Sequence, residues 1–146
     1  MLSHEEGQIG KISFTGWLTQ MDCAQRLRSS DVLVLPSLLE CGGAVVLEAM
    51  CMKMPVIATN WGGPADYLDD SCGLLIDPLS RDALIEGFAQ AMVKLASLPE
   101  LRKTLGVAGR EKVVSQFDWD VKVDLMLEIY KDLLTTSEVS LQRSHE

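Results

Sequence analysis

Two glutamates and a glycine pair lie close together in the sequence: Glu40, Gly42-Gly43 and Glu48. Carboxylates make good acceptors for vicinal hydroxyls, as in the ribose contact of dinucleotide-binding folds. A glycine pair lets backbone amides come close to a ligand. Residues 43–46 also open an apolar helical run, and free N–H groups at the start of a helix favour an anion such as a phosphate. This pattern predicts a ligand that carries phosphate, ribose and sugar hydroxyls.

Glu48 interrupts an otherwise apolar helix, which we predict over residues 43–52. A buried carboxylate is costly unless it has strong partners. Glu40 lies in the loop before this helix, so both carboxylates can point into one pocket. A second glycine pair, Gly62-Gly63, follows a predicted strand, and both a tight turn and a ligand contact are compatible with it.

Four short segments have the character of β-strands: 11–16, 31–37, 55–59 and 73–78. Segments that are apolar on both faces are typical of parallel sheets with helices on both sides. Each gap between them is long enough for a crossover helix. We therefore predict an open α/β fold. Ligands of such folds bind outside the carboxyl ends of the strands, and both glycine pairs fall there.

The second half of the chain has the pattern of helices. Ser80 can cap one helix, Ser97 with Glu100 resembles a capping box for the next, and Asp118 can cap the last. Thr19 with Asp22 resembles another capping box before the second strand. The last helix has an apolar stripe of Trp119, Val123, Met126, Tyr130 and Leu133. We predict one domain over 11–134, a flexible N-terminal segment over 1–10 and a flexible tail over 135–146.

The composition excludes several classes of function. The chain has 13 Lys and Arg against 21 Asp and Glu, a net charge of −8, whereas nucleic-acid binding needs clustered cations. No apolar run reaches the roughly 20 residues that span a bilayer. The first ten residues also lack a signal-peptide pattern, so the predicted location is cytoplasmic. The four cysteines show no CxxC spacing and the two histidines lie at opposite ends, so no metal site is expected.

Taken in order, these motifs resemble those of a known family, the group 1, family 4-like retaining glycosyltransferases. The seven residues between the two glutamates match the signature of that family. The resemblance covers about residues 11–134 and concerns the C-terminal half of those enzymes. It implies a GT-B fold, in which two Rossmann-like domains face each other across a cleft. The segments that carry it are 36–50 (PSLLECGGAVVLEAM), 55–59 (PVIAT), Gly62-Gly63, 73–78 (GLLIDP) and Phe117-Asp118-Trp119.

The resemblance also implies a role for each site residue. The C-terminal domain of the family binds a nucleotide-diphosphate sugar, whose glycosyl group is transferred to an acceptor. Glu40 would be catalytic, contacting the donor sugar and helping to set up its transfer, and Glu48 would bind the ribose hydroxyls. The loop Trp17-Leu18 would lie against the nucleobase. The amides that would hold the sugar and the diphosphate are those of Gly42, Gly43, Ala44 and Val45. Such enzymes generally need no metal, so no cofactor is expected.

The chain departs from the family pattern in two ways. Gly42 stands where the family usually has an aromatic residue, often Phe, which predicts a roomier or more flexible site. The family's C-terminal domain also starts with two further strands, which supply an Arg and a Lys for the diphosphate, and nothing before Lys11 corresponds to them. The N-terminal domain with the acceptor site has no counterpart either. We therefore expect the chain alone to be inactive.

The absent strands leave the pairing of residues 11–16 open. This segment is expected either to pair beside 31–37 or to leave an edge that a second chain covers. A homo-oligomer could form through that edge or through the last helix. The other interpretations are a stand-alone, non-catalytic nucleotide-sugar-binding module and part of a nucleotide-sugar epimerase of the same architecture. A signalling-type domain fits less well. It would need a phosphoacceptor Asp in an acidic pocket, and Asp31 lies at the wrong end of its strand for that role. For a full-length enzyme, a peripheral membrane location is compatible with the sequence.

Overall fold

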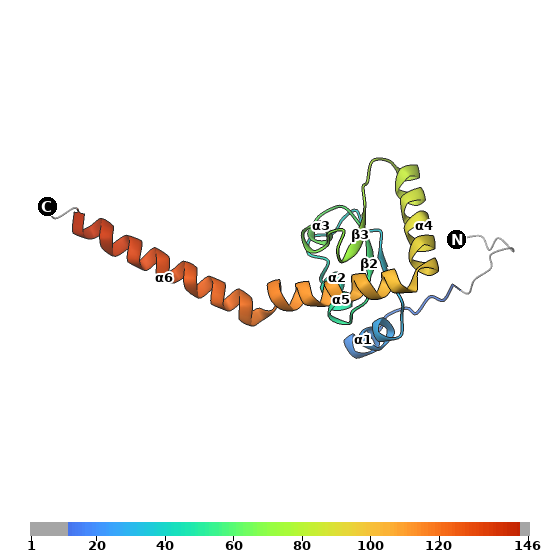
Figure 1. Cartoon of the computed structure of the whole chain (residues 1–146), viewed down its shortest axis with the longest axis horizontal. Coiled ribbons are helices and arrows are strands. Elements are labelled where there is room, and N and C mark those ends of the chain that lie inside the picture. Colours follow the sequence, from blue (N-terminus) through green and yellow to red (C-terminus); the bar gives the residue numbers. More distant parts are fainter. Residues whose placement is uncertain (1–11, 144–146) are drawn as a thin grey trace.

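A computed structural model of the chain describes residues 12–143, with side chains described up to residue 135. Its centre is a parallel sheet with the strand order β1-β2-β3 (Figure 1). In the register, Val34 lies beside Ile57, and Ile57 lies beside Leu74. The three strands are β1 (Leu33–Leu35), β2 (Val56–Thr59) and β3 (Gly73–Ile76). They confirm the predicted strands within 31–37, 55–59 and 73–78, each in a shorter form.

Six helices connect and cover the strands in the described residues. Thr19 caps α1 through its hydroxyl, which accepts a hydrogen bond from the Asp22 amide at 3.2 Å, and Ser80 caps α4 in the same way. The predicted capping box at Ser97 is wrong. Ser97 is the last residue of α4, and Pro99 starts the next helix without a side-chain cap. The helices are α1 (Gln20–Arg28), α2 (Ala44–Cys51), α3 (Gly63–Tyr67), α4 (Arg81–Ser97), α5 (Pro99–Gln116) and α6 (Trp119–Arg143).

Both faces of the sheet are covered, as the apolar strands predict. All four residues of β2 are buried. Val56 and Ala58 point to the face that packs against α2 and α5, and Ile57 points to the opposite face, under α4. This alternation follows from the two-residue period of a strand. A central strand buried on both faces fixes the positions at which the loops after β1, β2 and β3 emerge.

The predicted strand over 11–16 is wrong. The described part of this segment is not a strand; Ile12 is 73% exposed and Phe14 is 86% exposed. The segment runs away from the sheet before α1 (Figure 1). Its alternating pattern favours a strand locally, but a strand is stable only when a neighbouring strand pairs with it. No strand within residues 12–143 pairs with the outer edge of β1, so pairing beside 31–37 is not observed.

The last helix, α6, extends away from the body of the molecule (Figure 1). Its start is held by Phe117, whose ring makes an edge-to-face contact with Tyr67 and lies 5.1 Å from the Lys122 ammonium group. The predicted apolar stripe exists and is exposed, with Trp119 82% exposed. The helix continues to Arg143, beyond residue 134, and the predicted domain boundaries stay a prediction. Self-association through α6 or the β1 edge stays a prediction, and residues 1–10 lie outside the described residues.

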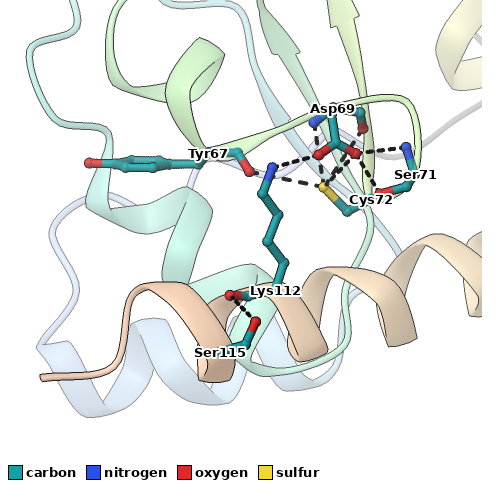
Figure 2. A network of polar contacts seen from close by, with 6 residues as sticks. All are labelled: Tyr67, Asp69, Ser71, Cys72, Lys112 and Ser115. Atoms are coloured by element: carbon teal, nitrogen blue, oxygen red, sulfur yellow. Dashed lines mark hydrogen bonds and ion pairs between the residues drawn. The ribbon is translucent and has the colours of Figure 1, made fainter. Parts of the chain in front are cut away.

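A polar network ties α5 to the turn before β3 (Figure 2). The Lys112 ammonium group lies 2.6 Å from the Asp69 carboxylate, which also accepts hydrogen bonds from the amide and hydroxyl of Ser71. These hydrogen bonds, the one from Lys112 first, hold the pKa of Asp69 well below its usual range. Burial raises the pKa of the neighbouring Cys72 thiol. The network lies at the amino end of β3, so it stabilises the fold and does not belong to the carboxyl edge.

We expect Asp69→Asn to lower the free energy of unfolding at pH 7 by about 0.5–1 kcal/mol, because the pair with Lys112 is partly exposed. The pKa of Asp69 is lower in the folded than in the unfolded protein, so its contribution is present above the unfolded pKa and is lost as the pH falls below about 4. Urea denaturation of the parental chain and of Asp69→Asn at pH 7 and pH 3 measures the difference in their free energy of unfolding. Asp70→Asn is the matched control, since Asp70 makes no ion pair within residues 12–135.

Candidate functional site

Three loops meet at the carboxyl edge of the sheet, where the strand order places them side by side. They follow β1, β2 and β3. Two hydrogen bonds join the second loop to the third. The Asn60 amide donates to the Ile76 carbonyl at 2.8 Å, and the Asn60 side chain donates to the Asp77 carboxylate at 2.6 Å. This pair is not among the residues predicted from the sequence, although a polar residue directly after each of two neighbouring strands is a signal for it.

The two glycine pairs pack against each other. The Gly63 amide donates a hydrogen bond to the Cys41 carbonyl at 3.2 Å. A Cβ atom on Gly62 would lie well inside 3.0 Å of the Glu40 carbonyl oxygen, and one on Gly63 would clash equally with the Gly42 carbonyl. The structure gives another reason for glycine at both positions, since these glycines allow the loop after β2 to touch the loop after β1.

Glu40 is positioned by its own loop. The carboxylate is half-buried, and its Oε1 atom accepts a hydrogen bond from the Gly43 amide at 2.9 Å. Gly43 precedes α2 in the left-handed conformation, with φ at 58°, which glycine adopts without strain. A Cβ atom at this position would lie only 3.0 Å from the Pro64 side chain. The Glu40 carboxylate is thus held at the start of α2, and its Oε2 atom has no donor within residues 12–135.

The amides of the loop and the first turn of α2 are otherwise free. Gly42, Ala44 and Val45 donate no backbone hydrogen bond to any described residue, and the Gly43 amide is taken by Glu40. That these four amides hold the sugar and the diphosphate stays a prediction. Gly42 is exposed, and a Cβ atom there would meet nothing within 4 Å. This open space agrees with the roomier site that a glycine at this position predicts.

Glu48 is exposed on α2. The burial suggested by its apolar neighbours is wrong, because α2 uses only the face of Val46, Ala49 and Met50 for the core. Glu48 shares the exposed face of this helix with Ala44, one turn earlier. Its carboxylate makes no hydrogen bond or ion pair with a residue in the described part of the chain. Along one side of α2, the Glu40 carboxylate is therefore followed by the free amide of Ala44 and then by the Glu48 carboxylate.

The structure does not bring Trp17 and Leu18 to this site. Trp17 is 97% exposed, and Leu18 lies over a shallow hollow formed with Asp22, Gln25 and Arg26 of α1. Figure 1 shows α1 well apart from α3, the helix that begins at the carboxyl edge. The reason is the unpaired segment before α1, since a loop reaches the carboxyl edge only when its strand belongs to the sheet. The predicted contact of Trp17-Leu18 with a nucleobase has no support here.

A hollow of about 480 Å³ lies elsewhere, beside the open edge of β1. Val32, Val34, Met92 and Ala96 line its apolar part, and Asp31 and Arg102 line its polar end. Glu40 and Glu48 lie on an open surface. Within the described residues, no three His, Cys, Asp or Glu side chains gather as metal ligands would, and whether an intact enzyme needs a metal stays a prediction.

The sequence family "Glycosyl transferases group 1" matches residues 1–112. The chain belongs to this family. The group 1 glycosyltransferases similar to it include the lipopolysaccharide core biosynthesis glycosyltransferase LpsE of Rhizobium meliloti, which is 34% identical over 129 residues, 88% of this chain and 36% of LpsE. The chain spans about a third of the length of such relatives. This family membership confirms the resemblance drawn from the two glutamates and the glycine pairs.

Solved structures of other proteins share this fold. Sucrose-phosphate synthase from Thermosynechococcus elongatus superposes with a TM-score of 0.69 and 32% identity, over 85% of this chain and 30% of that protein. The C-terminal domain of the group 1 family protein LpcC from Francisella tularensis superposes with a TM-score of 0.60 and 28% identity, over 74% of this chain and 53% of that domain. The chain thus has the fold of part of a GT-B C-terminal domain, Rossmann-like with flanking helices.

Proposed function

We propose that this chain is the donor-binding part of a retaining glycosyltransferase that transfers a hexosyl group from a nucleotide-diphosphate sugar to an acceptor. One observation carries the proposal: the Glu40 carboxylate is held at the start of α2 beside the free amides of Ala44 and Val45. A carboxylate next to free helix-start amides suits a ligand with hydroxyls on one side and phosphate on the other. Glu48, farther along the same helix, suits the ribose hydroxyls.

The chemistry of transfer explains why these groups belong together. The bond between the anomeric carbon and the diphosphate breaks, and its electron pair leaves with the diphosphate. A bond from the acceptor hydroxyl to the anomeric carbon forms on the same face, and the hydroxyl proton passes to an oxygen of the departing diphosphate. Negative charge grows on the diphosphate, where the free amides and the positive end of the α2 dipole stabilise it. The Glu40 carboxylate faces the sugar, where positive charge develops.

The free amides stabilise the negative charge of the diphosphate, as a metal ion does in other transferases. We therefore propose that donor binding needs no metal. The partners are the donor, an acceptor and an N-terminal domain that forms the other wall of the cleft. No helix within residues 12–143 is long and apolar enough to span a membrane, and the cytoplasmic or membrane-peripheral location stays a prediction. No observation favours the stand-alone binding module or the epimerase over the transferase.

The isolated chain is expected to bind nucleotide sugars weakly, in the high-micromolar to millimolar range, and to transfer no sugar. The reason is that the open surface buries only part of a ligand. Calorimetry and saturation-transfer NMR with UDP, GDP and ADP sugars measure the affinity. Glu48→Gln is the matched variant, since Glu48 is exposed and makes no contact that the fold needs. It should bind several-fold more weakly. A parental chain that binds none of these sugars at millimolar concentration contradicts the proposed site.

A further inference from the structure

A large aromatic side chain is exposed at the carboxyl edge of the sheet. Trp61 follows the buried strand β2 by one residue, and its side chain is 53% exposed. An exposed indole leaves a broad apolar face in contact with water, and such faces serve as platforms for ligands. The other exposed tryptophans belong to other parts of the chain: Trp17 precedes α1, and Trp119 begins α6.

The backbone of Trp61 is fixed on both sides. Its amide donates to the Thr59 carbonyl at 2.8 Å, which makes a tight turn at the end of β2. Asn60, just before it, is bonded to Asp77 in the loop after β3. Gly62, just after it, touches the carbonyl of Glu40 so closely that no Cβ atom would fit. Because its backbone is held in this way, the loop that carries Trp61 needs little further ordering when a ligand binds.

This packing makes Trp61 a neighbour of Glu40, although the two residues belong to different loops. Gly62 joins them, because its backbone lies directly against the Glu40 carbonyl. The position of Gly42 carries no side chain, and a Cβ atom there would meet nothing within 4 Å. The loop after β2 thus carries an exposed tryptophan one residue from its contact with Glu40, and the loop after β1 leaves open space at Gly42.

We infer that Trp61 is a specificity-determining residue that contacts the sugar ring of the donor. The inference rests on the proposed function, in which Glu40 contacts the donor sugar. Pyranose rings have apolar C–H faces that pack on an aromatic ring, and hydroxyls at their edges that a carboxylate binds. Trp61 and Glu40 together supply both. A sugar whose C–H face is interrupted by an axial hydroxyl packs less well on the indole, so the residue selects among sugars.

The test compares Trp61→Ala with Trp119→Ala, a matched loss of an exposed tryptophan outside the site. Calorimetry or saturation-transfer NMR gives the Kd of each variant for a nucleotide-diphosphate sugar and for the nucleoside diphosphate alone. Trp61→Ala should raise the Kd for the sugar nucleotide about three- to tenfold. The Kd for the nucleoside diphosphate should not change, and Trp119→Ala should change neither. The Kd of Trp61→Phe for the sugar nucleotide should lie between those of the parental chain and Trp61→Ala.

Three results would overturn the inference. The first is an unchanged Kd for the sugar nucleotide in Trp61→Ala while the parental chain binds it, which leaves the proposed function standing. The second is an equal loss of affinity for the nucleoside diphosphate, which places the ring against the nucleotide. The third is no binding by the parental chain at all, which overturns the proposed function as well. If thermal denaturation shows that Trp61→Ala is unfolded, the comparison of the parental chain with Trp61→Phe decides instead.

Discussion

Gly62→Ala is expected to lower the free energy of unfolding by about 3 kcal/mol or more. Gly62 has φ at 59° and ψ at −148°, a region of backbone conformation that is open almost only to glycine. A Cβ atom there would also lie inside 3.0 Å of the Glu40 carbonyl oxygen, which is backbone and cannot rotate away. Either the loop after β2 or the loop after β1 must move. Urea denaturation followed by circular dichroism measures the loss.

Gly42→Ala is the control for this prediction. Gly42 lies in the loop that Gly62 touches, but a Cβ atom there meets nothing within 4 Å, and the φ angle is not in the left-handed region. We expect Gly42→Ala to change the stability by less than about 0.5 kcal/mol. Equal stabilities of the two variants would show that the two loops do not touch as described. If Gly62→Ala folds, it should still bind donor more weakly than Gly42→Ala, because Glu40 is displaced.

Glu40→Gln is expected to reduce kcat by at least about 100-fold in the glycosyltransferase of which we propose this chain is a part. The side-chain oxygen of glutamine can still accept the hydrogen bond from the Gly43 amide, so the loop keeps its conformation. Only the negative charge is lost. Glu40→Ala should lose turnover to a similar degree, and it should also lower stability by about 1 kcal/mol, because the Gly43 amide loses its acceptor. Steady-state kinetics and thermal denaturation separate the two effects.

Glu48→Ala provides the contrast in the same enzyme. It should mainly weaken donor binding, by about 1.5–3 kcal/mol for a lost charged hydrogen bond, and leave kcat less affected than Glu40→Gln does. Stability should hardly change, because the side chain is exposed and makes no hydrogen bond or ion pair within residues 12–135. Transfer at the parental rate by both variants would refute the assignment of the site. A loss of kcat by Glu48→Ala equal to that of Glu40→Gln would refute the division of roles.

Most of the secondary structure could be predicted, because it follows from patterns within a few residues. The apolar run of β2, the capping hydroxyl of Thr19 and the cap at Ser80 each act over one turn or one strand. The segment 11–16 shows the limit of this reasoning. Ile12 and Phe14 alternate as in a real strand, but pairing needs a partner from elsewhere in the chain. A local pattern carries no information about whether that partner is present.

The place of the site was accessible from the sequence. Parallel strands bring their carboxyl ends to one edge, so the loops that hold Glu40, Gly42-Gly43 and Gly62-Gly63 had to meet there. The resemblance to the group 1 glycosyltransferases was found from the same residues. What each group does at that edge depends on three-dimensional packing. Gly62-Gly63 touch the other loop, Glu40 takes the Gly43 amide, and Glu48 is exposed. Such contacts depend on distances between loops that a helix and a strand separate in the chain, and residue types alone do not specify those distances.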